Sequence, residues 1–419
     1  MGNAKPVRVG VFGVGRGGSF AAQAAVMEGV QFVAVCDQRE SALRQFATQY
    51  NDVTTYTDYD KFLEHDMDAV VLANYATEHA PAAVKALNAG KHVQSESIAI
   101  ETMAQGVELV RAVEKTGLIY MYAENYPYSN VVQEMRYLYK KGDIGEFKYG
   151  EGEYVHPVSK ETKVSLSPTW DHWRNWVPST FYCTHSMGPI MYVTRTRPVK
   201  VNGFVVPHDY DNPAMSQTAT RRDTAGILMC RMDTGAYAKV MMGSLKCHYT
   251  WCRIYGNKGE MENLRHGGAN MIKVHKEPWD KEPGEVADLI YAPEFREFHD
   301  EAVRSGHGGG DFFMMLEFVR AIRSGEPPYL DVYAGLQMSC IGLLAHRSAL
   351  NNSQTMDVPS WRDAAELTQW ENDHYSCDPA APEEYRLPSS VLGEIRKPPD
   401  AREQFEKLAR EIRPDWYDG

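Results

Sequence analysis

A glycine-rich turn near the N-terminus has the clearest chemical potential in this sequence, Gly13-Val14-Gly15-Arg16-Gly17-Gly18. Its glycines follow the G-x-G-x-x-G pattern, which lets the backbone turn sharply and approach a pyrophosphate closely. Asp37 ends the next β-branched run, 19 residues after Gly18, where a carboxylate can accept hydrogen bonds from both adenosine ribose hydroxyls. The pattern predicts a dinucleotide site; a glycine turn without function is the less favoured interpretation.

The charges beside this turn bear on the choice of cofactor. Asp37 would repel a 2′-phosphate, which favours NAD over NADP. Arg39, two residues further along, could pair with such a phosphate and would weaken that preference. We therefore expect NAD, with Asp37 and Arg39 near its adenosine ribose.

A lone carboxylate marks a second position, in the stretch GKHVQSESIAI at residues 90–100. Glu96 ends the short run HVQSE, which we predict to be a buried parallel strand. Ligands of such sheets bind in the crevice at the carboxyl ends of the strands. Glu96 could there accept hydrogen bonds from the nicotinamide ribose, although a solvated loop acid is the alternative.

Strands that alternate with helices are needed to position these groups. Apolar runs at 7–13, 30–37, 68–74 and 119–125 alternate with helical patterns such as AAQAAVMEG and AAVKALNAG. This alternation predicts parallel βαβ units and a doubly wound sheet. We expect an NAD-binding Rossmann domain over residues 1–125.

The pattern changes after about residue 146, where strand-like segments follow one another with turn signals such as DTG and GNKG. They predict a large, mainly antiparallel open sheet, and hence an α/β fold overall. The segment 263–310 is predicted to be a loop, and two amphipathic helices follow it. We expect a substrate-binding and oligomerisation domain over 126–360 and an extension over 361–419 that packs on the body.

The composition narrows the class of protein. The 419 residues are 43% hydrophobic and 24% charged, which is typical of globular chains with two domains. A net charge of -12 disfavours nucleic acid or an anionic membrane as a partner. The seven cysteines and the histidines match no disulfide or metal spacing, and the N-terminal stretch has no apolar signal segment. We expect a cytoplasmic protein with reduced thiols and no metal.

Several segments together resemble the glucose–fructose oxidoreductase/inositol dehydrogenase/rhizopine catabolism (Gfo/Idh/MocA) family: GVGRGG, VAVCD, LANYATEHAPAAVKALNAGKHV, Glu96 and EMRYLYKKGDIGEFKYGEG. The resemblance spans most of residues 7–350 and implies a homo-oligomer, a dimer or tetramer. Family dehydrogenases usually carry Glu-Lys-Pro where this chain has Glu96-Ser97-Ile98, and Ser97 cannot supply the cation of that lysine. Asn74-Tyr75 replaces the usual Thr-Pro, whereas His79 stays in register; by resemblance Asn74 and His79 contact the cofactor.

A second resemblance is to glycoside hydrolase family 109, a branch that also lacks the lysine. The segments FYCTHSMGPI (181–190), SGHGGGDFFMMLEF (305–318) and ENYPY (124–128) are similar to motifs of this branch, with Cys183 in place of a proline. Its members keep NAD bound and hydrolyse glycosides by transient oxidation at carbon three, elimination, water addition and re-reduction. The resemblance implies tightly bound, recycled NAD, with Asn125 at the cofactor.

The same resemblance assigns acid–base roles to Tyr182 and His185. They are three residues apart, so both can face one pocket if the segment is helical. Tyr128 could hydrogen-bond the oxidised position. His307 lies in a glycine-rich stretch that could act as a flap and bring an imidazole over the leaving group.

Tryptophans recur every three residues in SPTWDHWRNWVPS, at positions 170, 173 and 176. Aromatic faces stack on sugars, and Arg174 or Asn175 could bond hydroxyls. We expect Trp173, Arg174 and Trp176 to bind substrate. A core-packing stripe is the alternative, and for Trp170 the two interpretations carry equal weight.

Three functions remain open from the sequence. The favoured one is an NAD-dependent glycosidase that acts on a small glycoside. The second is a net sugar dehydrogenase in which Tyr182 or His185 replaces the missing lysine. The third is a catalytically silent sugar- or nucleotide-binding relative.

Overall fold

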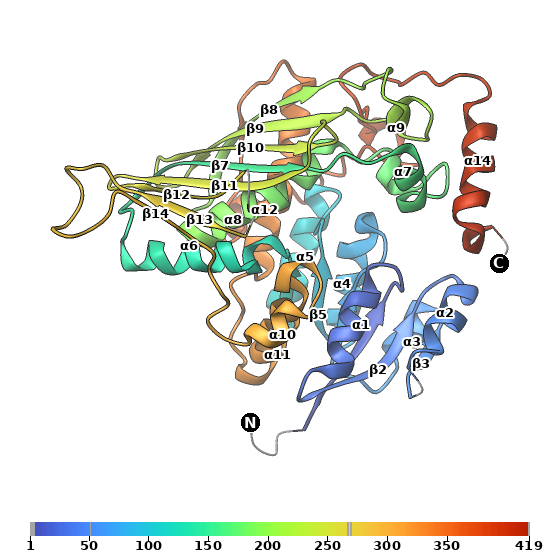
Figure 1. Cartoon of the computed structure of the whole chain (residues 1–419). Coiled ribbons are helices and arrows are strands. Elements are labelled where there is room, and N and C mark those ends of the chain that lie inside the picture. The colour runs from blue at the N-terminus through green and yellow to red at the C-terminus, as the bar shows by residue number, and fades with distance from the viewer. Residues whose placement is uncertain (1–4, 51, 266–267, 269, 418–419) are drawn as a thin grey trace.

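Two sheets organise the molecule, one of six strands and one of nine (Figure 1). The computed structural model describes residues 5–50, 52–265, 268 and 270–417. The first sheet belongs to the N-terminal part of the chain and the second to the part that follows. The predicted α/β fold is confirmed.

The six-stranded sheet is parallel throughout, with the strand order β3-β2-β1-β4-β5-β6. Its strands are rich in buried apolar residues because helices cover both faces. The strands are β1 (Val7–Phe12), β2 (Val30–Cys36), β3 (Thr54–Tyr56), β4 (Ala69–Leu72), β5 (His92–Glu96) and β6 (Tyr120–Ala123). The helices between them are α1 (Gly17–Val26), α2 (Glu40–Ala47), α3 (Tyr59–Leu63), α4 (His79–Asn88) and α5 (Met103–Thr116). This is the predicted Rossmann topology.

The nine-stranded sheet has the order β14-β13-β12-β11-β7-β10-β9-β8-β15 and is antiparallel except where β10 pairs with β7. The predicted open sheet is thus confirmed. Its strands are β7 (Phe147–Val155), β8 (Pro198–Val206), β9 (Ala225–Met232), β10 (Tyr237–Gly243), β11 (Tyr249–Gly256), β12 (Glu260–Asn263), β13 (Ile272–His275), β14 (Asp288–Tyr291) and β15 (Met356–Asp357).

The prediction of a loop over 263–310 was wrong in part. Strands β13 and β14 and helix α10 (His299–Val303) lie within it. The two strands have only four residues each, and in β13 Ile272 and Val274 alternate with Lys273 and His275. So short an alternation is hidden among the prolines and charges around it.

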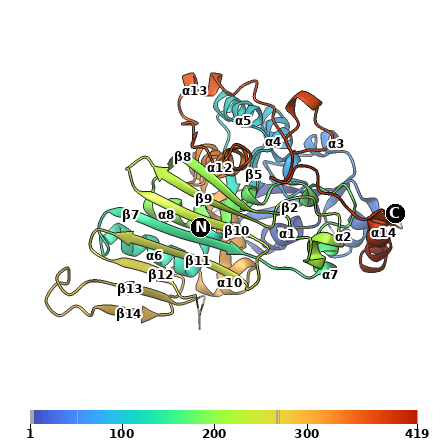
Figure 2. The ribbon, with the colours of Figure 1, turned by 90° about the horizontal axis from the view of Figure 1, so that it is seen from above.

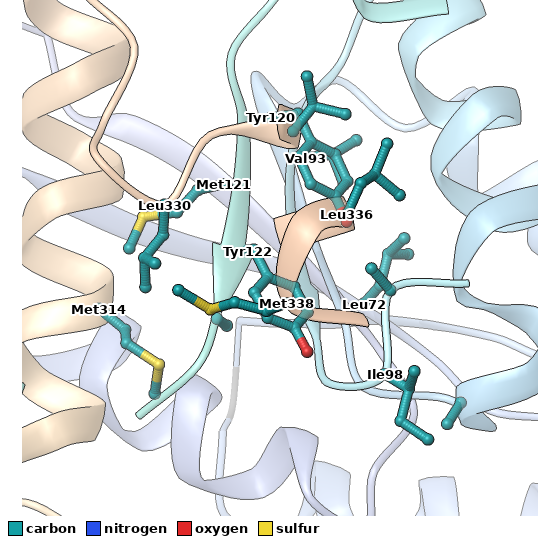
Figure 3. Close-up of a cluster of buried hydrophobic side chains, with 14 of the residues drawn as sticks. Leu72, Val93, Ile98, Tyr120, Met121, Tyr122, Met314, Leu330, Leu336 and Met338 are labelled. Atoms are coloured by element: carbon teal, nitrogen blue, oxygen red, sulfur yellow. The ribbon is translucent and has the colours of Figure 1, made fainter. Parts of the chain in front are cut away.

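Helix α12 (Val332–Leu350) contacts strands of both sheets, β6 and β8, and α11 (Gly310–Ser324) packs on α1. Figure 3 shows Leu336 and Met338 of α12 beside the side chains of β6, in one buried cluster that continues into both sheets. Gly335 permits this close approach, because a Cβ there would lie 2.7 Å from Cβ of Tyr122. Helices α6 (Asn130–Lys141) and α8 (Thr184–Thr194) also pack near the large sheet.

The C-terminal segment packs on the second part of the chain and also reaches the N-terminal part. Helix α14 (Ala401–Ile412) packs on α7 (Lys160–Leu166), where Phe405 and Ala409 of α14 form a small core with Val164. Figure 2 shows α14 beside α7 and close to α2. The remaining short helices are α9 (Pro213–Ser216) and α13 (Ala364–Thr368), with 3₁₀ turns η1 (Ala76–Glu78), η2 (Tyr126–Tyr128), η3 (Trp173–Asn175), η4 (Ser179–Cys183), η5 (His307–Gly309), η6 (Glu383–Tyr385) and η7 (Pro414–Trp416).

Within the described ranges, no helix combines the length and the apolar character needed to span a bilayer. The same ranges hold no group of three or more His, Cys, Asp or Glu side chains placed to bind a metal. All seven cysteines are free thiols, and Cys247 is exposed. Cytoplasmic location stays a prediction.

Candidate active site

The glycine turn between β1 and α1 forms the first wall of the site. Gly13 has a φ of 98°, and a Cβ there would lie 2.5 Å from the carbonyl oxygen of Ala73. A Cβ on Gly15 would instead meet nothing within 4 Å, so open space lies above it. Helix α1 begins at Gly17 without a side-chain cap or an acid in its first turn. A helix N-terminus left without a cap or an acid fits a pyrophosphate.

Asp37 is fixed against this turn. Its carboxylate accepts hydrogen bonds from the backbone N–H of Val14 at 3.0 Å and of Arg39 at 2.9 Å. The Arg39 guanidinium lies 3.4 Å from Asp37, 3.4 Å from Asp415, and 4.2 Å above the Trp416 ring. Two carboxylates therefore balance the charge that could have favoured a 2′-phosphate.

Arg16 joins the cofactor turn to the glycine-rich segment before α11. Its guanidinium donates to Glu96 at 2.8 Å and to both oxygens of Asp311 at 2.6 and 3.1 Å. Asp311 also accepts from Nδ1 of His307 at 3.0 Å. Burial alone would raise the pKa of Asp311, but the hydrogen bonds from His307 and Arg16 lower it to about 2. The role of Asp311 was not predicted from the sequence, although this residue directly follows the HGGG run.

Three buried polar atoms at the carboxyl edge of the sheet have no hydrogen-bond partner among the described residues: Oδ1 of Asn74, Nε2 of His79 and Oδ1 of Asn125. His79 donates from Nδ1 to the Ile98 carbonyl at 2.8 Å. Burial lowers the pKa of His79 to about 4, so the imidazole is neutral. Buried polar atoms are normally paired. With the glycine turn and Glu96, these atoms fit a nicotinamide dinucleotide.

A histidine–carboxylate pair lies at the start of α8. Nδ1 of His185 donates to Oε1 of Glu124 at 2.7 Å and lies 3.0 Å from Oε2. The Glu124 side chain has no solvent exposure, and it follows β6 directly. The Tyr182 and His185 rings are 5.9 Å apart across the junction of η4 and α8. The structure thus brings Tyr182 and His185 together; the role of Glu124 was missed, although ENYPY begins with it.

Aromatic rings from β7 and η2 enclose this pair. Tyr154 lies 4.5 Å from the His185 ring and 6.4 Å from the Tyr182 ring, and Tyr126 lies 5.0 Å from His185. Burial raises the pKa of both Tyr154 and Tyr126, which keeps them neutral at ordinary pH. No sequence signal marked Tyr154, because either face of a strand in an open sheet can bear a tyrosine.

Two neighbouring cavities open at the pair. Tyr182 lines one that is open to solvent, together with Tyr154, His156 and Arg174. His185 lines the other, together with Asn125, His307 and Trp251. Arg174 donates a hydrogen bond to the phenol oxygen of Tyr182.

Other residues expected at the site lie in the core. Tyr128 is buried with its ring 5.8 Å from that of Tyr192, and burial raises its pKa well above the ordinary value. Trp173 is buried beneath Arg174 and stacks 6.5 Å from Tyr182, and Trp176 is buried in the main core. Trp170 packs on Phe405 of α14. None of these four is among the described residues that line the two cavities.

The parallel sheet with its glycine turn, the acid after β2 and the attached open sheet define a two-domain protein of the NAD-binding oxidoreductase class. Residues 7–124 match the model of the oxidoreductase family with an NAD-binding Rossmann fold (GFO_IDH_MocA). Residues 246–368 match the model of the glycosyl hydrolase 109 C-terminal domain. The chain is thus similar to the Gfo/Idh/MocA oxidoreductases over its N-terminal part and to glycosyl hydrolase 109 proteins over its C-terminal part.

Individual proteins agree with this placement. A glycosyl hydrolase family 109 protein of Shewanella sp. (strain MR-4) is 28% identical over 412 residues, covering 86% of this chain and 87% of the relative. An alpha-N-acetylgalactosaminidase of Shewanella oneidensis is 26% identical over 412 residues, covering 87% and 86%. The structure of a levoglucosan dehydrogenase in complex with NADH and levoglucosan has a TM-score of 0.73 at 18% identity, covering 85% of this chain and all of that chain. This last likeness establishes the fold.

Proposed function

We propose that this protein is an NAD-dependent glycosidase for a small glycoside, working by transient oxidation at carbon three, elimination, water addition and re-reduction. The observation that carries the proposal is the His185–Glu124 pair beside Tyr182, in which Nδ1 of His185 lies 2.7 Å from the carboxylate. This pair occurs in a chain that has serine rather than lysine at position 97. Protons can thus be moved at the site without an ammonium group. The named glycosidase among the similar proteins supports the same reaction.

A nicotinamide group held by the residues described above supplies reversible oxidation of a sugar carbinol, and a carbonyl acidifies the neighbouring C–H bond. Glu124 holds the His185 imidazole in one tautomer and stabilises the imidazolium that forms when Nε2 takes a proton. Arg174, by donating to the Tyr182 oxygen, stabilises that oxygen when it bears negative charge. His185 and Tyr182 therefore act as the proton acceptor and donor.

The remaining polar groups hold and orient the cofactor and the substrate. Glu96 keeps one oxygen on Arg16 and the other 3.1 Å from the N–H of Ser97, and both oxygens retain lone pairs for ribose hydroxyls. His307, half exposed at a φ of 53°, lines the cavity that also contains His185. It would protonate the leaving group or hold it.

We further infer that the open sheet joins copies of the chain into a dimer or tetramer. Its solvent-facing side carries exposed large side chains on three strands, Phe204 of β8, Tyr237 of β10 and Ile290 of β14. Exposed apolar side chains on one sheet support a protein–protein contact. Light scattering coupled to size-exclusion chromatography tests it, and a monomer at micromolar concentration would contradict it.

The proposed reaction is tested with the purified protein and a panel of 4-nitrophenyl glycosides, with NAD below the protein concentration. Nitrophenol released over many turnovers without accumulating NADH supports the glycosidase, as does deuterium from D₂O appearing at carbon two of the product. NADH formed in proportion to substrate supports a net dehydrogenase instead. If neither product forms across the panel, the proposed reaction is wrong for these sugars.

A further inference from the structure

Three cationic side chains converge on the cavity that Tyr182 lines. Lys163 comes from α7, Arg174 from η3 and Arg222 from the segment before β9, and all three are among the lining residues. Because the three elements are separate in sequence, the cluster is not a charge run of one helix. It is a feature of the folded site.

These cations have little to neutralise them. Lys163 is buried, and its Nζ donates to the backbone carbonyl of Arg174 at 3.0 Å rather than to a carboxylate. Arg174 donates to the Tyr182 oxygen and stacks 4.4 Å from Trp173. Arg222 lies 5.9 Å from the centroid of the Tyr182 ring and has no side-chain hydrogen bond or ion pair with the part of the chain that the structure describes.

The neighbouring charged groups do not remove the excess of positive charge in this cavity. Asp223 is the one carboxylate among the described lining residues, and it is occupied by Ser390 at 2.5 Å and the N–H of Val391 at 3.1 Å. Burial raises the pKa of Asp223, while the hydrogen bonds from Ser390 and Val391 oppose that rise. Lys397 adds a further cation nearby: burial, and then Arg221, lower its pKa to about 8. Burial, with Arg222 and Arg174, lowers the pKa of Lys163 well below its ordinary value.

Cations without counter-charges are costly in a cavity partly shielded from water, and a site that brings one buried and two partly buried cations together beside its acid–base pair is suited to a ligand that supplies the missing negative charge. We infer that this cavity binds an oxyanion of the substrate, a carboxylate or a sulfate-type group on the sugar or its aglycone, through Arg222, Arg174 and Lys163. The inference rests on the proposed function, because Tyr182 lines the same cavity. It specifies an anionic glycoside, whereas a neutral acetamido sugar would leave all three cations unpaired.

The test compares matched pairs of 4-nitrophenyl glycosides that differ only in one oxyanion: hexuronosides against hexosides, and 6-sulfated hexosides against unsulfated ones. For the native protein we expect kcat/KM to be at least roughly 100-fold higher for the anionic member of one pair, since each charge-assisted hydrogen bond contributes roughly tenfold or more. The pair that shows the preference distinguishes a carboxylate from a sulfate-type group.

Substitutions locate the effect. Arg222→Met should remove most of the preference, roughly 10- to 100-fold in kcat/KM for the anionic substrate, and should leave the neutral one nearly unchanged. Arg222→Lys should restore part of it. Lys163→Met should also weaken the preference for the anionic substrate, and Lys160→Met is its matched control, because Lys160 lies one turn earlier on α7 and is not among the lining residues. Circular dichroism and melting curves check that each variant is folded.

Binding provides a readout that is independent of turnover. In calorimetric titrations the anionic glycoside should bind more tightly to the native protein than to Arg222→Met. If it does so and no glycoside is hydrolysed, the proposed reaction fails while the oxyanion site stands. If neutral and anionic glycosides are hydrolysed equally and Arg222→Met changes neither, the oxyanion site is wrong while the proposed reaction stands.

Discussion

His185 and Glu124 lie 61 residues apart in the sequence, yet Nδ1 of His185 is 2.7 Å from Oε1 of Glu124. The histidine opens α8, and the glutamate follows β6 of the other sheet. The proposed proton-transfer group is therefore oriented by a carboxylate that follows a strand of the parallel sheet. If the proposed function is right, activity depends on this contact between the two parts of the chain.

Replacing Glu124 by Gln should preserve the shape of the site and abolish the support for an imidazolium at His185. We expect kcat to fall roughly 10²- to 10⁴-fold, because an amide neither fixes the same tautomer nor stabilises the cation. The pH–rate profile should lose its limb for the base. NAD content, measured on the denatured protein, should be unchanged, and a loss of NAD would mean that Glu124 acts on cofactor binding instead.

Asp311 should contribute stability that depends on pH. Its folded pKa of about 2 is below the ordinary value of 3.8, so the contribution is present above about pH 4 and is lost as pH falls towards 2. The shift corresponds to about 2 kcal/mol. Urea unfolding of Asp311→Asn should show a deficit of that order at pH 6 that shrinks by pH 3.

Asp60→Asn provides the control for this comparison, because Asp60 makes an exposed ion pair with Lys85 at 2.9 Å. Exposed pairs contribute less than about 1 kcal/mol. Equal losses in the two variants would contradict a special role for the Arg16–Asp311–His307 network.

His79 should make the cofactor-free protein less stable in mild acid. Its pKa is about 4 when folded and 6.5 ordinarily, so between these values the unfolded chain binds a proton that the folded chain does not. Stability therefore falls as pH drops from about 6.5 to 4, by about 3 kcal/mol for this residue. His79→Asn should flatten that slope in chemical denaturation, whereas the exposed His299→Asn should leave it unchanged.

The preference of the site for NAD over NADP should depend on the contacts that the C-terminal turn η7 makes with Arg39. In Asp415→Asn one of its two carboxylate neighbours loses its charge, and we expect the affinity for NADP to rise roughly tenfold relative to NAD. In Trp416→Ala the stacked ring is lost, and NAD should dissociate several-fold faster by fluorescence displacement. Trp279→Ala, at an exposed tryptophan after β13, is the matched control and should change neither value.

Local patterns allowed much of the Rossmann domain to be predicted. The glycine turn, Asp37 and Glu96 lie at strand ends, and a parallel sheet places such ends along one edge whatever the rest of the chain does. Tyr182 and His185 were also accessible, since three residues separate them. Long-range pairs were not: Arg16 and Asp311 are 295 residues apart, and no periodicity connects them.

The tryptophans show a different limit. The spacing of three between Trp170, Trp173 and Trp176 does not indicate which face of each ring is covered by other parts of the chain. In the structure Arg174 covers Trp173, and α14 covers Trp170. Burial by segments more than 200 residues away, such as Phe405, leaves no trace in the local sequence.

The ion pair between Arg39 and Asp415 joins residues separated by 376 positions. A dinucleotide bound at Asp37 and Arg39 would thus lie against a side chain that the C-terminal segment already contacts, and its binding would hold that segment more firmly. The rate at which a protease cleaves α14 would then report the fraction of the protein that has dinucleotide bound. This rate can be measured on a gel without any substrate.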